Sequence, residues 1–427
     1  MKKKLFDAID SLAPSLADLF KTIAQRTSDG VGISRDAYGE VETAAGDILI
    51  RFAHDVGLDA GYDRVGNVNV AAKGRLAEPA TILIGSHIDS VPRGGNYDGL
   101  AGVVAGIGAL AALQKCGDGA AHGVHTLGFR GEESPWFGTA YLGSKLLTGQ
   151  MSRAEAENLR RFDTKKTLAE HLRQLGVNLD DLGRPAIPLD KVRAYFELHI
   201  EQAPLLEDLG KPIGIATAVR GNIRYPFAKC FGRYAHSGAV PRHLRADALM
   251  ATAKLIAYCD EIWHREIKAG HDDLVFTCGV FQTNSTEHSM TKVPGEISFT
   301  FNVGGINDEV MERFHREAMA KADALAKEHH VRFEFGTRVG TGAVGLDPGI
   351  AAALDGTARE AGIEAHRMPT VGHDAAMFVK RGTPAGIVLI RNANGSHNPA
   401  EHMEMDDFTV GLKVLTATVS DMTASRR

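Results

Sequence analysis

Two short apolar segments flank one long apolar stretch in the first third of the chain. Segment 81–85 is a short continuous apolar run, which is typical of a strand buried on both faces, and segment 124–129 is expected to be another buried strand. The stretch 100–115, rich in glycine and alanine, is long enough for a tightly packed internal helix but too short to span a bilayer. A helix over 47–56 and a strand over 65–70 are expected before them. This succession predicts an α/β domain whose mostly parallel sheet carries helices on both faces.

The pattern changes near residue 213, where strand-like segments alternate with two long amphipathic helices. A chain of 427 residues also exceeds the length at which one hydrophobic core usually stops growing. We therefore predict one domain formed by residues 1–212 and 341–427, with residues 213–340 inserted into it as an α+β domain of two helices on an antiparallel sheet. The expected elements of the insertion are strands at 213–219, 224–230, 274–281, 296–303 and 331–335 and helices at 245–268 and 308–330.

Composition excludes several classes of protein. The chain is 44% hydrophobic and 24% charged with a net charge of −5, which is ordinary for a globular protein and gives no basic surface for nucleic acid. Asp7 and Asp10 interrupt what would be the apolar core of a signal peptide. None of the four cysteines forms a CxxC pair, and we expect reduced thiols. The sequence therefore predicts a cytoplasmic protein that binds neither nucleic acid nor membranes.

Imidazole and carboxylate side chains follow the predicted strands of the first domain. His87 and Asp89 come after one strand, Glu132 and Glu133 after the next, and His199 closes a third. Ligand sites in open α/β sheets lie at the carboxyl ends of the strands. We therefore expect these side chains to meet at one edge of the sheet.

Each of these pairs also has an ordinary structural explanation. A loop histidine such as His87 is commonly satisfied by hydrogen bonds, and adjacent carboxylates such as Glu132 and Glu133 usually form a solvated acidic patch. At the end of a buried strand, however, two neighbouring carboxylates repel each other unless positive charge lies between them. Bound metal ions supply that charge, and imidazole with carboxylate suits zinc, manganese, cobalt or nickel.

Five such motifs occur along the chain in a fixed order. They occupy residues 85–99, 131–134, 197–204, 372–376 and 395–401. In this order and spacing the chain resembles the carbamoylase, β-ureidopropionase and allantoate amidohydrolase family of two-metal amidohydrolases, which are hydantoinase/carbamoylase-type amidases with a metallopeptidase-like fold. The resemblance extends from the helix near residue 47 to a C-terminal helix at 406–423.

The resemblance implies a set of metal ligands. His87 and His199 would bind one divalent metal, Glu133 and His397 would bind a second, and Asp98 would bridge the two. Two metals about 3.5–4 Å apart acidify a shared water and polarise the carbonyl that it attacks. Zinc is the expected metal, with manganese, cobalt or nickel as alternatives.

The resemblance also implies roles around the metals. Glu132 would be the general base that takes the proton of the water and passes it to the leaving nitrogen. His236, in the inserted domain, would stabilise the tetrahedral intermediate, either in its own subunit or across a homodimer. Gln202 and His373 match substrate-contacting positions, and Asp89 is placed to orient the His87 imidazole from behind.

Two positions that contact the substrate in the family carry different residues in this chain. Gly304 stands where the family has an arginine that binds the substrate carboxylate, and Thr291 stands where it has an asparagine. A glycine cannot replace a guanidinium as a partner for a carboxylate. Either Arg220, Arg224 or Arg242 binds the substrate carboxylate from another position, or the substrate is larger or less acidic on the side away from the scissile bond.

We therefore predict a two-metal hydrolase that cleaves a C–N amide or ureido bond in a small molecule, such as an N-carbamoyl amino acid, a ureido acid or a related amide. The alternatives are an aminoacylase-like or dipeptidase-like hydrolase on the same fold and a non-catalytic metal-binding protein. The last would have lost a metal ligand or Glu132, and the sequence retains them all. The inserted domain is expected to act as a lid and to form a homodimer.

Overall fold

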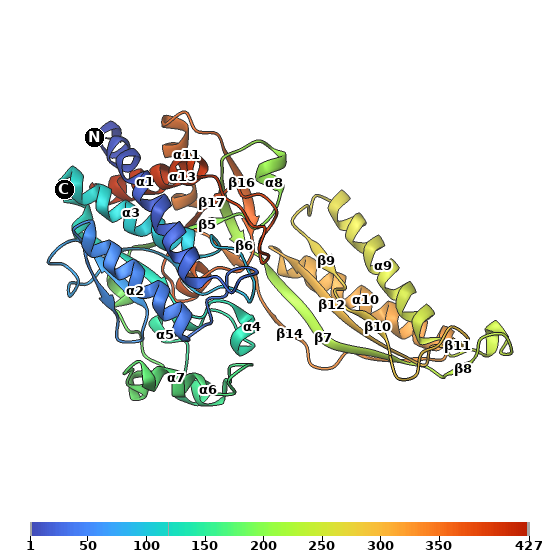
Figure 1. The fold of residues 1–427 in the computed structure, drawn as a ribbon. Helices are drawn as coiled ribbons and strands as arrows, with labels where there is room; N and C mark the ends of the chain where they lie inside the picture. Colours follow the sequence, from blue (N-terminus) through green and yellow to red (C-terminus); the bar gives the residue numbers. More distant parts are fainter. Residues whose placement is uncertain (1, 118, 425–427) are drawn as a thin grey trace. The chain divides into compact units, whose positions relative to one another are not determined.

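The computed structural model describes residues 2–117 and 119–424 (Figure 1). These residues form two compact units. Unit 1 extends to Thr217 and resumes at Leu346, and unit 2 comprises Ala218–Gly345. The chain passes from unit 1 to unit 2 along β6 (Ile213–Val219) and returns through β15 (Val344–Gly345), which pairs antiparallel with β6.

The sheet of unit 1 has nine strands in the order β1-β2-β4-β3-β5-β17-β6-β15, with β16 paired to β6. Its centre, β4-β3-β5-β17, is parallel, which confirms the predicted fold class, whereas the strands on either side pair antiparallel. The strands not yet placed are β1 (Asp59–Tyr62), β2 (Val68–Ala71), β3 (Ile82–His87), β4 (Val124–Phe129), β5 (Ala194–Ile200), β16 (Ala365–Thr370) and β17 (Ala385–Ile390).

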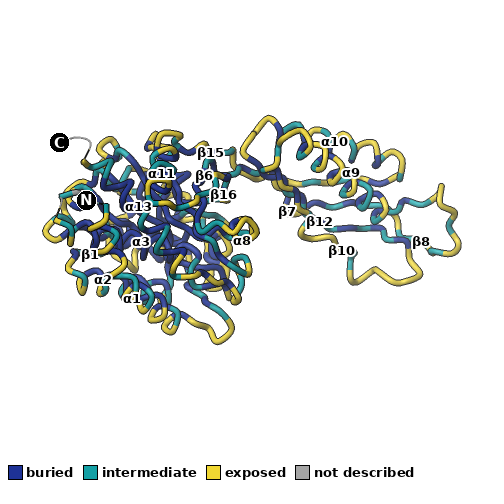
Figure 2. Tube along the Cα trace, turned by 90° about the horizontal axis from the view of Figure 1, so that it is seen from above, coloured by how far each residue is buried: buried dark blue, intermediate teal, exposed yellow. Residues whose placement is uncertain are grey.

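Helix α3 (Leu100–Cys116) packs against β3, β4 and β5 and is buried along most of its length (Figure 2). Its glycines permit this close packing. A Cβ on Gly102 would lie 2.2 Å from the Leu198 carbonyl oxygen, and one on Gly106 would lie 2.5 Å from Cγ2 of Thr126. The glycine-rich composition of the stretch is therefore a requirement for helix–sheet contact.

Further helices cover α3 and the second face of the sheet. Helices α1 (Lys2–Thr27), α2 (Glu40–Asp55), α11 (Pro348–Glu360) and α13 (Met405–Ala424) form one group with α3. On the other face, α12 (Ala375–Val379) contacts β5 and β17, and its Phe378 ring stacks on Tyr195 at 4.1 Å. Helix α1 was not among the predicted elements. Its buried apolar residues at helical spacing, such as Leu5, Ile9 and Leu16, were the signal for it.

Between β4 and β5 the chain forms only short helices: α4 (Ser134–Phe137), α5 (Leu142–Leu147), α6 (Arg153–Asn158), α7 (Leu168–Gln174) and two 3-10 turns, Leu179–Asp181 and Leu189–Lys191. Another short helix, α8 (Leu205–Asp208), follows β5, and a 3-10 turn at Ala120–Gly123 precedes β4. None of the helices in the described residues is both long and apolar enough to cross a membrane.

Unit 2 is built from an antiparallel sheet and two long helices, as expected. The sheet follows the order β10-β12-β7-β13, with β14 paired to β7 and β9 to β12. Helices α9 (Ala248–Lys268) and α10 (Asp308–His329) pack on it and on each other around one apolar core. The strands are β7 (Gly221–Phe231), β9 (Val275–Thr277), β10 (Phe281–Thr283), β12 (Glu296–Gly305), β13 (Arg332–Glu334) and β14 (Val339–Thr341).

Two small elements complete unit 2. The two-residue strands β8 (Ala235–His236) and β11 (Lys292–Val293) pair with each other, and a 3-10 turn spans Arg242–Leu244. The single strand expected over 274–281 is divided into β9 and β10.

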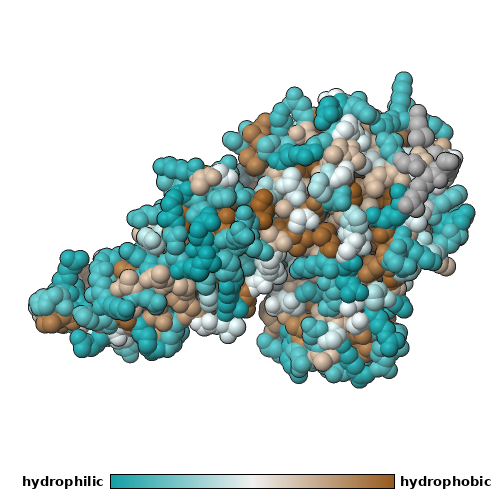
Figure 3. All heavy atoms as spheres, turned by 180° about the vertical axis from the view of Figure 1, so that it is seen from behind, coloured by the Kyte–Doolittle hydropathy of each residue, from teal (hydrophilic) through white to brown (hydrophobic). Residues whose placement is uncertain are grey.

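On the face seen in Figure 3, hydrophilic side chains cover most of the surface, with hydrophobic side chains between them in smaller patches.

Candidate metal centre and active site

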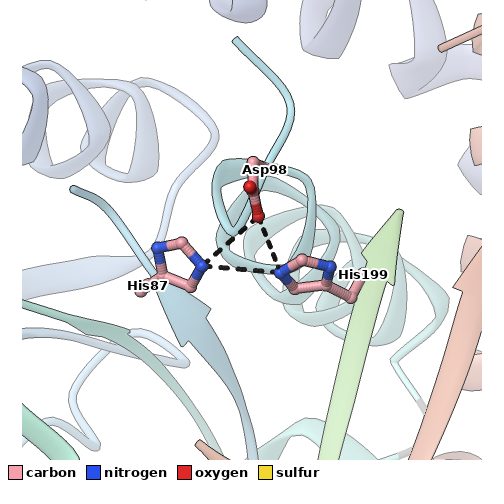
Figure 4. A group of neighbouring side chains, drawn as sticks. All are labelled: His87, Asp98 and His199. Atoms are coloured by element: carbon pink, nitrogen blue, oxygen red, sulfur yellow. Dashed lines mark hydrogen bonds and ion pairs between the residues drawn. The ribbon is translucent and has the colours of Figure 1, made fainter. Parts of the chain in front are cut away.

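The parallel centre of the sheet brings His87 and His199 together (Figure 4). His87 is the last residue of β3, and His199 lies near the end of the neighbouring parallel strand β5. Their Nε2 atoms are 3.4 Å apart, and Oδ1 of Asp98 lies 3.6 Å from the first and 3.2 Å from the second. All three side chains are buried.

Asp98 reaches this position from the turn before α3. The turn passes so close to the first imidazole that a Cβ on Gly99 would lie 2.4 Å from the His87 ring. Gly99 also has a φ of +67°, in the left-handed region that favours glycine. Residue 99 must therefore be glycine for Asp98 and His87 to approach each other.

The same Asp98 carboxylate faces a second group through its other oxygen. His397 Nε2 lies 3.1 Å from Oδ2 of Asp98 and 3.2 Å from Oε1 of Glu133. The structure thus brings together the five predicted ligands as two groups that share Asp98. Within each group one potential ligand atom per residue lies within 4.8 Å of the others.

The hydrogen bonds behind the imidazoles fit metal binding. Nδ1 of His87 lies 3.1 Å from the Asp89 carbonyl oxygen, and Nδ1 of His199 lies 2.9 Å from that of Ile200. A carbonyl only accepts hydrogen bonds, so each Nδ1 carries the proton and each Nε2 keeps its lone pair. The lone pair of His199 also accepts a hydrogen bond from the Gly99 backbone N–H at 3.2 Å. Among the described residues, Oδ1 of Asp98 is buried without a hydrogen-bond donor although it faces both Nε2 atoms. A cation between these three atoms would satisfy all of them.

Asp89 holds the loop that carries Glu132 and Glu133. Its two carboxylate oxygens accept the backbone N–H groups of Glu132 and Glu133, at 2.9 and 3.0 Å. Its Oδ1 is also 3.5 Å from Nδ1 of His87. The residue thus connects the first imidazole to the double glutamate.

Glu132 is an acidic side chain that lies near the predicted metal ligands and belongs to neither of the two groups that share Asp98. It is 8% exposed, and its Oε2 lies 4.0 Å from Nε2 of His87. Burial raises the pKa of Glu132 well above its ordinary range, and the negative charge of the neighbouring Glu133 adds to this shift. A carboxylate with a raised pKa is suited to accept a proton near neutral pH.

Gln202 and His373 lie next to the ligands. Gln202 donates from Nε2 to Oδ2 of Asp98 at 3.0 Å. The His373 ring lies 4.3 Å from the His199 ring, and its Nε2 is 2.7 Å from the Thr370 hydroxyl oxygen. Burial lowers the pKa of His373 well below its ordinary range, and His199 adds to this, so His373 is a neutral polar group beside the site.

Sequence reasoning gave no role to three polar residues within its own motifs. Ser396 donates to Oδ2 of Asp98 at 2.9 Å, and Glu401 accepts the backbone N–H groups of Tyr97 and Asp98. Glu197 is fully buried near His199 and His373 and accepts a hydrogen bond from Ser86. The alternation of β5 was a signal for Glu197, because residues 197 and 199 point to the same face of a strand.

The remaining predicted residues belong to unit 2. His236 pairs with Lys292 in the β8–β11 ladder, and the backbone N–H of the next residue, Ser237, donates to the Thr291 carbonyl, so His236 and Thr291 are neighbours. The three arginines are placed separately. Arg220 precedes β7 and donates to the Asp273 carbonyl, Arg224 lies on β7 and donates to Asn302, and Arg242 begins a 3-10 turn.

Comparison with known proteins places these motifs in a family. The sequence profile of peptidase family M20/M25/M40 matches residues 83–421. The chain is 29% identical over 391 residues to an N-carbamoyl-L-amino acid amidohydrolase of Geobacillus stearothermophilus, covering 91% of this chain and 93% of the relative. It is 28% identical over 410 residues to an allantoate amidohydrolase of Bacillus subtilis, covering 95% and 97%.

A solved structure agrees with these relatives. The crystal structure of an amidase of the hydantoinase/carbamoylase family from Burkholderia multivorans superposes with a TM-score of 0.84 at 26% identity, covering 96% of this chain and 97% of that one. The family resemblance seen in the motifs is therefore confirmed. With the profile matching most of its length, the chain belongs to peptidase family M20/M25/M40, among relatives that are amidohydrolases of the hydantoinase/carbamoylase type.

Proposed function

We propose that this protein hydrolyses a non-peptide C–N bond, ureido or amide, in a small molecule with the help of two divalent metals. The observation that carries the proposal is the Asp98 carboxylate, which faces two imidazoles through one oxygen and the His397–Glu133 pair through the other. His87 and His199 would hold one metal, Glu133 and His397 the other, and Asp98 both. When bound, such metals supply Lewis acidity toward a water and toward the scissile carbonyl.

In this proposal Glu132 performs the proton transfers. Its carboxylate takes a proton from the attacking water and delivers it to the leaving nitrogen. Burial and the hydrogen bonds that the backbone N–H groups of residues 132 and 133 donate to the Asp89 carboxylate hold the loop in place for both steps. His236 of unit 2 would donate a hydrogen bond to the developing oxyanion, as the family resemblance implies.

The substrate differs, in this proposal, from an ordinary N-carbamoyl-L-α-amino acid bound by a lid arginine. A Cβ on Gly304 would lie 3.1 Å from the Gly221 carbonyl oxygen and 3.2 Å from Cγ2 of Val275, so neighbouring atoms already occupy the space beside this position. A buried carboxylate without a charge partner costs several kcal/mol. Gln202, His373 and Thr291 are the proposed substrate contacts. The alternative is that Arg220 or Arg242 replaces the missing arginine and binds a substrate carboxylate.

A release assay tests the reaction and the substrate class together. Metal-reconstituted enzyme is offered ureido compounds and simple amides, and ammonia release with or without carbon dioxide separates the two types of cleavage. The values of kcat/KM for N-carbamoyl-L-alanine and N-carbamoyl-L-methionine are compared with those for uncharged or aromatic amides. An efficiency above about 10⁴ M⁻¹s⁻¹ on the simple carbamoyl amino acids, the low end for typical enzymes, would contradict the proposed specificity. Failure to hydrolyse any member of the panel would contradict the reaction.

We also propose a homodimer formed through unit 2. Large apolar side chains of this unit are unusually exposed, with Phe227 at 83%, Leu244 at 54% and Met290 at 97%. Exposed apolar side chains of this size are typical of surfaces that associate. Light scattering at micromolar concentration measures the assembly, and a fully active monomer would refute it.

A further inference from the structure

The four successive residues 130–133, which lead into the double glutamate, are each held by a side chain from elsewhere in the chain. The backbone N–H of Arg130 donates to Oδ1 of Asn67, and those of Glu132 and Glu133 donate to Asp89. Between them, the N–H of Gly131 donates to Oε1 of Glu42 at 2.9 Å. Glu42 belongs to helix α2 and to none of the five sequence motifs.

Glu42 is fixed in turn by a buried arginine. Its Oε2 accepts hydrogen bonds from Nε of Arg130 at 2.5 Å and from the backbone N–H of Tyr38 at 2.7 Å. Both members of the pair are 1% exposed. Arg130 is held further by the Thr43 hydroxyl at 2.7 Å, and its guanidinium lies 5.1 Å from the centre of the Tyr38 ring.

The backbone at Gly131 leaves no freedom to compensate for a loss of this contact. Gly131 has a φ of +63°, and a Cβ there would lie 2.8 Å from Cε2 of Tyr38 and 3.1 Å from Cδ1 of Leu142. On its other side the Gly131 carbonyl accepts a hydrogen bond from the Leu142 N–H. The residue before Glu132 is thus packed on the Tyr38 ring and hydrogen-bonded on both sides.

We propose that Glu42, held by Arg130, is a positioning residue that fixes the direction of the Glu132 side chain through the backbone of Gly131. The inference rests on the proposed role of Glu132 as general base. A buried ion pair is weak support for stability, because the desolvation of both charges offsets their attraction. Glu42 accepts three hydrogen bonds, and one of them comes from Gly131, the residue before Glu132. The pair therefore has a role in positioning rather than in stability. Misplacing a reacting group by about 1 Å can lower a rate on the order of 10²-fold.

The first test is Glu42→Gln. The amide has one acceptor and one donor end, so it cannot accept from Gly131 and from the Arg130–Tyr38 pair at once. We expect kcat to fall roughly 10- to 100-fold, with little change in KM and with the full metal content retained. A kcat within about twofold of wild type in folded, metal-loaded protein would overturn the inference.

A double variant separates position from stability. Glu42→Met/Arg130→Met removes both charges together, and replacing a buried pair by apolar residues is often neutral or stabilising. We expect this protein to lose kcat as Glu42→Gln does, because Gly131 again has no acceptor, and to lose stability only through the unpaired N–H groups of Tyr38 and Gly131, since no unpaired charge stays buried. Wild-type kcat in this variant would also overturn the inference.

The decisive comparison uses Glu132→Gln as the background. If Glu42 acts through the base, adding Glu42→Gln to Glu132→Gln lowers the residual rate no further. If the two losses multiply, Glu42 acts by another route and the inference fails. Wild-type turnover by Glu132→Gln alone would refute the proposed base, and with it this inference, an outcome distinct from multiplicative losses.

Glu266 provides a control in unit 2. It is 4% exposed and pairs with Arg313 at 2.5 Å between the two long helices, without a contact to residues 130–133. The Arg313 side chain is 41% exposed, so this pair is less buried than Glu42 and Arg130. Glu266→Gln should leave kcat near wild type. An equal loss of kcat in this control would show that breaking any Glu–Arg pair impairs turnover, and would overturn the specific role of Glu42.

Discussion

Adding one methyl group to the first turn of α3 should disturb the metal centre without altering any ligand. In Gly102→Ala the new Cβ would lie 2.2 Å from the Leu198 carbonyl oxygen and 2.5 Å from Cβ of Ser86. These atoms belong to β5 and β3, one residue before His199 and His87. The opposing carbonyl is backbone in the middle of the sheet, so it cannot turn aside as a side chain would.

The size of the disturbance follows from ordinary contact distances. A carbon and a carbonyl oxygen normally stay about 3.3–3.6 Å apart, so the first turn of α3 must move by roughly 1 Å. Overpacking of this kind lowers the free energy of unfolding by about 1–3 kcal/mol, and the higher helix propensity of alanine offsets at most about 1 kcal/mol of this loss. Asp98 lies two residues before the start of α3 and would move with it, and a shift of about 1 Å can lower turnover on the order of 10²-fold.

Gly108 in the same helix is the control. A Cβ there would lie 3.0 Å from Cδ1 of Leu16 and 3.2 Å from Cδ2 of Leu412, the movable ends of two side chains. Thermal unfolding, metal content after reconstitution and kcat are measured for both variants. Gly108→Ala should stay within about 1 kcal/mol of wild type with normal activity, whereas Gly102→Ala should be less stable and bind metal poorly. If the two variants behave alike, the close packing of α3 does not position Asp98 and the reasoning is wrong.

Three further predictions concern the active site. Glu132→Gln should keep its metals and fold but lose on the order of 10²–10⁴ in kcat; near wild-type turnover would show that another group is the base. Burial raises the pKa of Glu132, and the charge of Glu133 raises it further. Because the base works only when it is deprotonated, kcat/KM should fall as the pH drops through this pKa, which lies above about 4.3, the ordinary value for glutamate. An acid limb at or below that value would contradict the argument. Chelation should abolish activity, with zinc, manganese, cobalt or nickel restoring it to differing degrees; active enzyme that elemental analysis finds free of metal would refute the metal centre.

Local sequence patterns were sufficient for the centre of the fold. The strand expected over 124–129 is β4, with the same bounds, and the helix expected over 100–115 is α3, longer by one residue. The helix α3 is apolar over residues 100–113, and β4 is buried although it contains His125 and Thr126, so its apolar residues Val124, Leu127 and Phe129 were the signal for it. The helix expected over 47–56 begins earlier, at Glu40, because its first turn is polar where it faces solvent and the Arg130 pair.

Patterns were weaker where elements are short or at the edge of the sheet. The segment between β4 and β5 is a series of short helices, two of which, α6 and α7, begin with a capping box. That signal exists in the sequence, but a helix of six residues has too few turns to show a hydrophobic period. The antiparallel pairing of β2 with β4 could not be predicted, since strand direction depends on the path of the chain in space.

The sequence by itself determined which residues are available for chemistry. Five motifs, three of them placed at predicted strand ends, included every residue of the two groups that share Asp98. Only the tertiary structure decided how those residues are held. The partners of the Glu132 loop are Asn67, Glu42 and Asp89, which precede it by 63, 89 and 43 residues in the chain. A buried carboxylate is stable wherever the fold places hydrogen-bond donors next to it. A local sequence pattern cannot predict which distant N–H groups will be those donors.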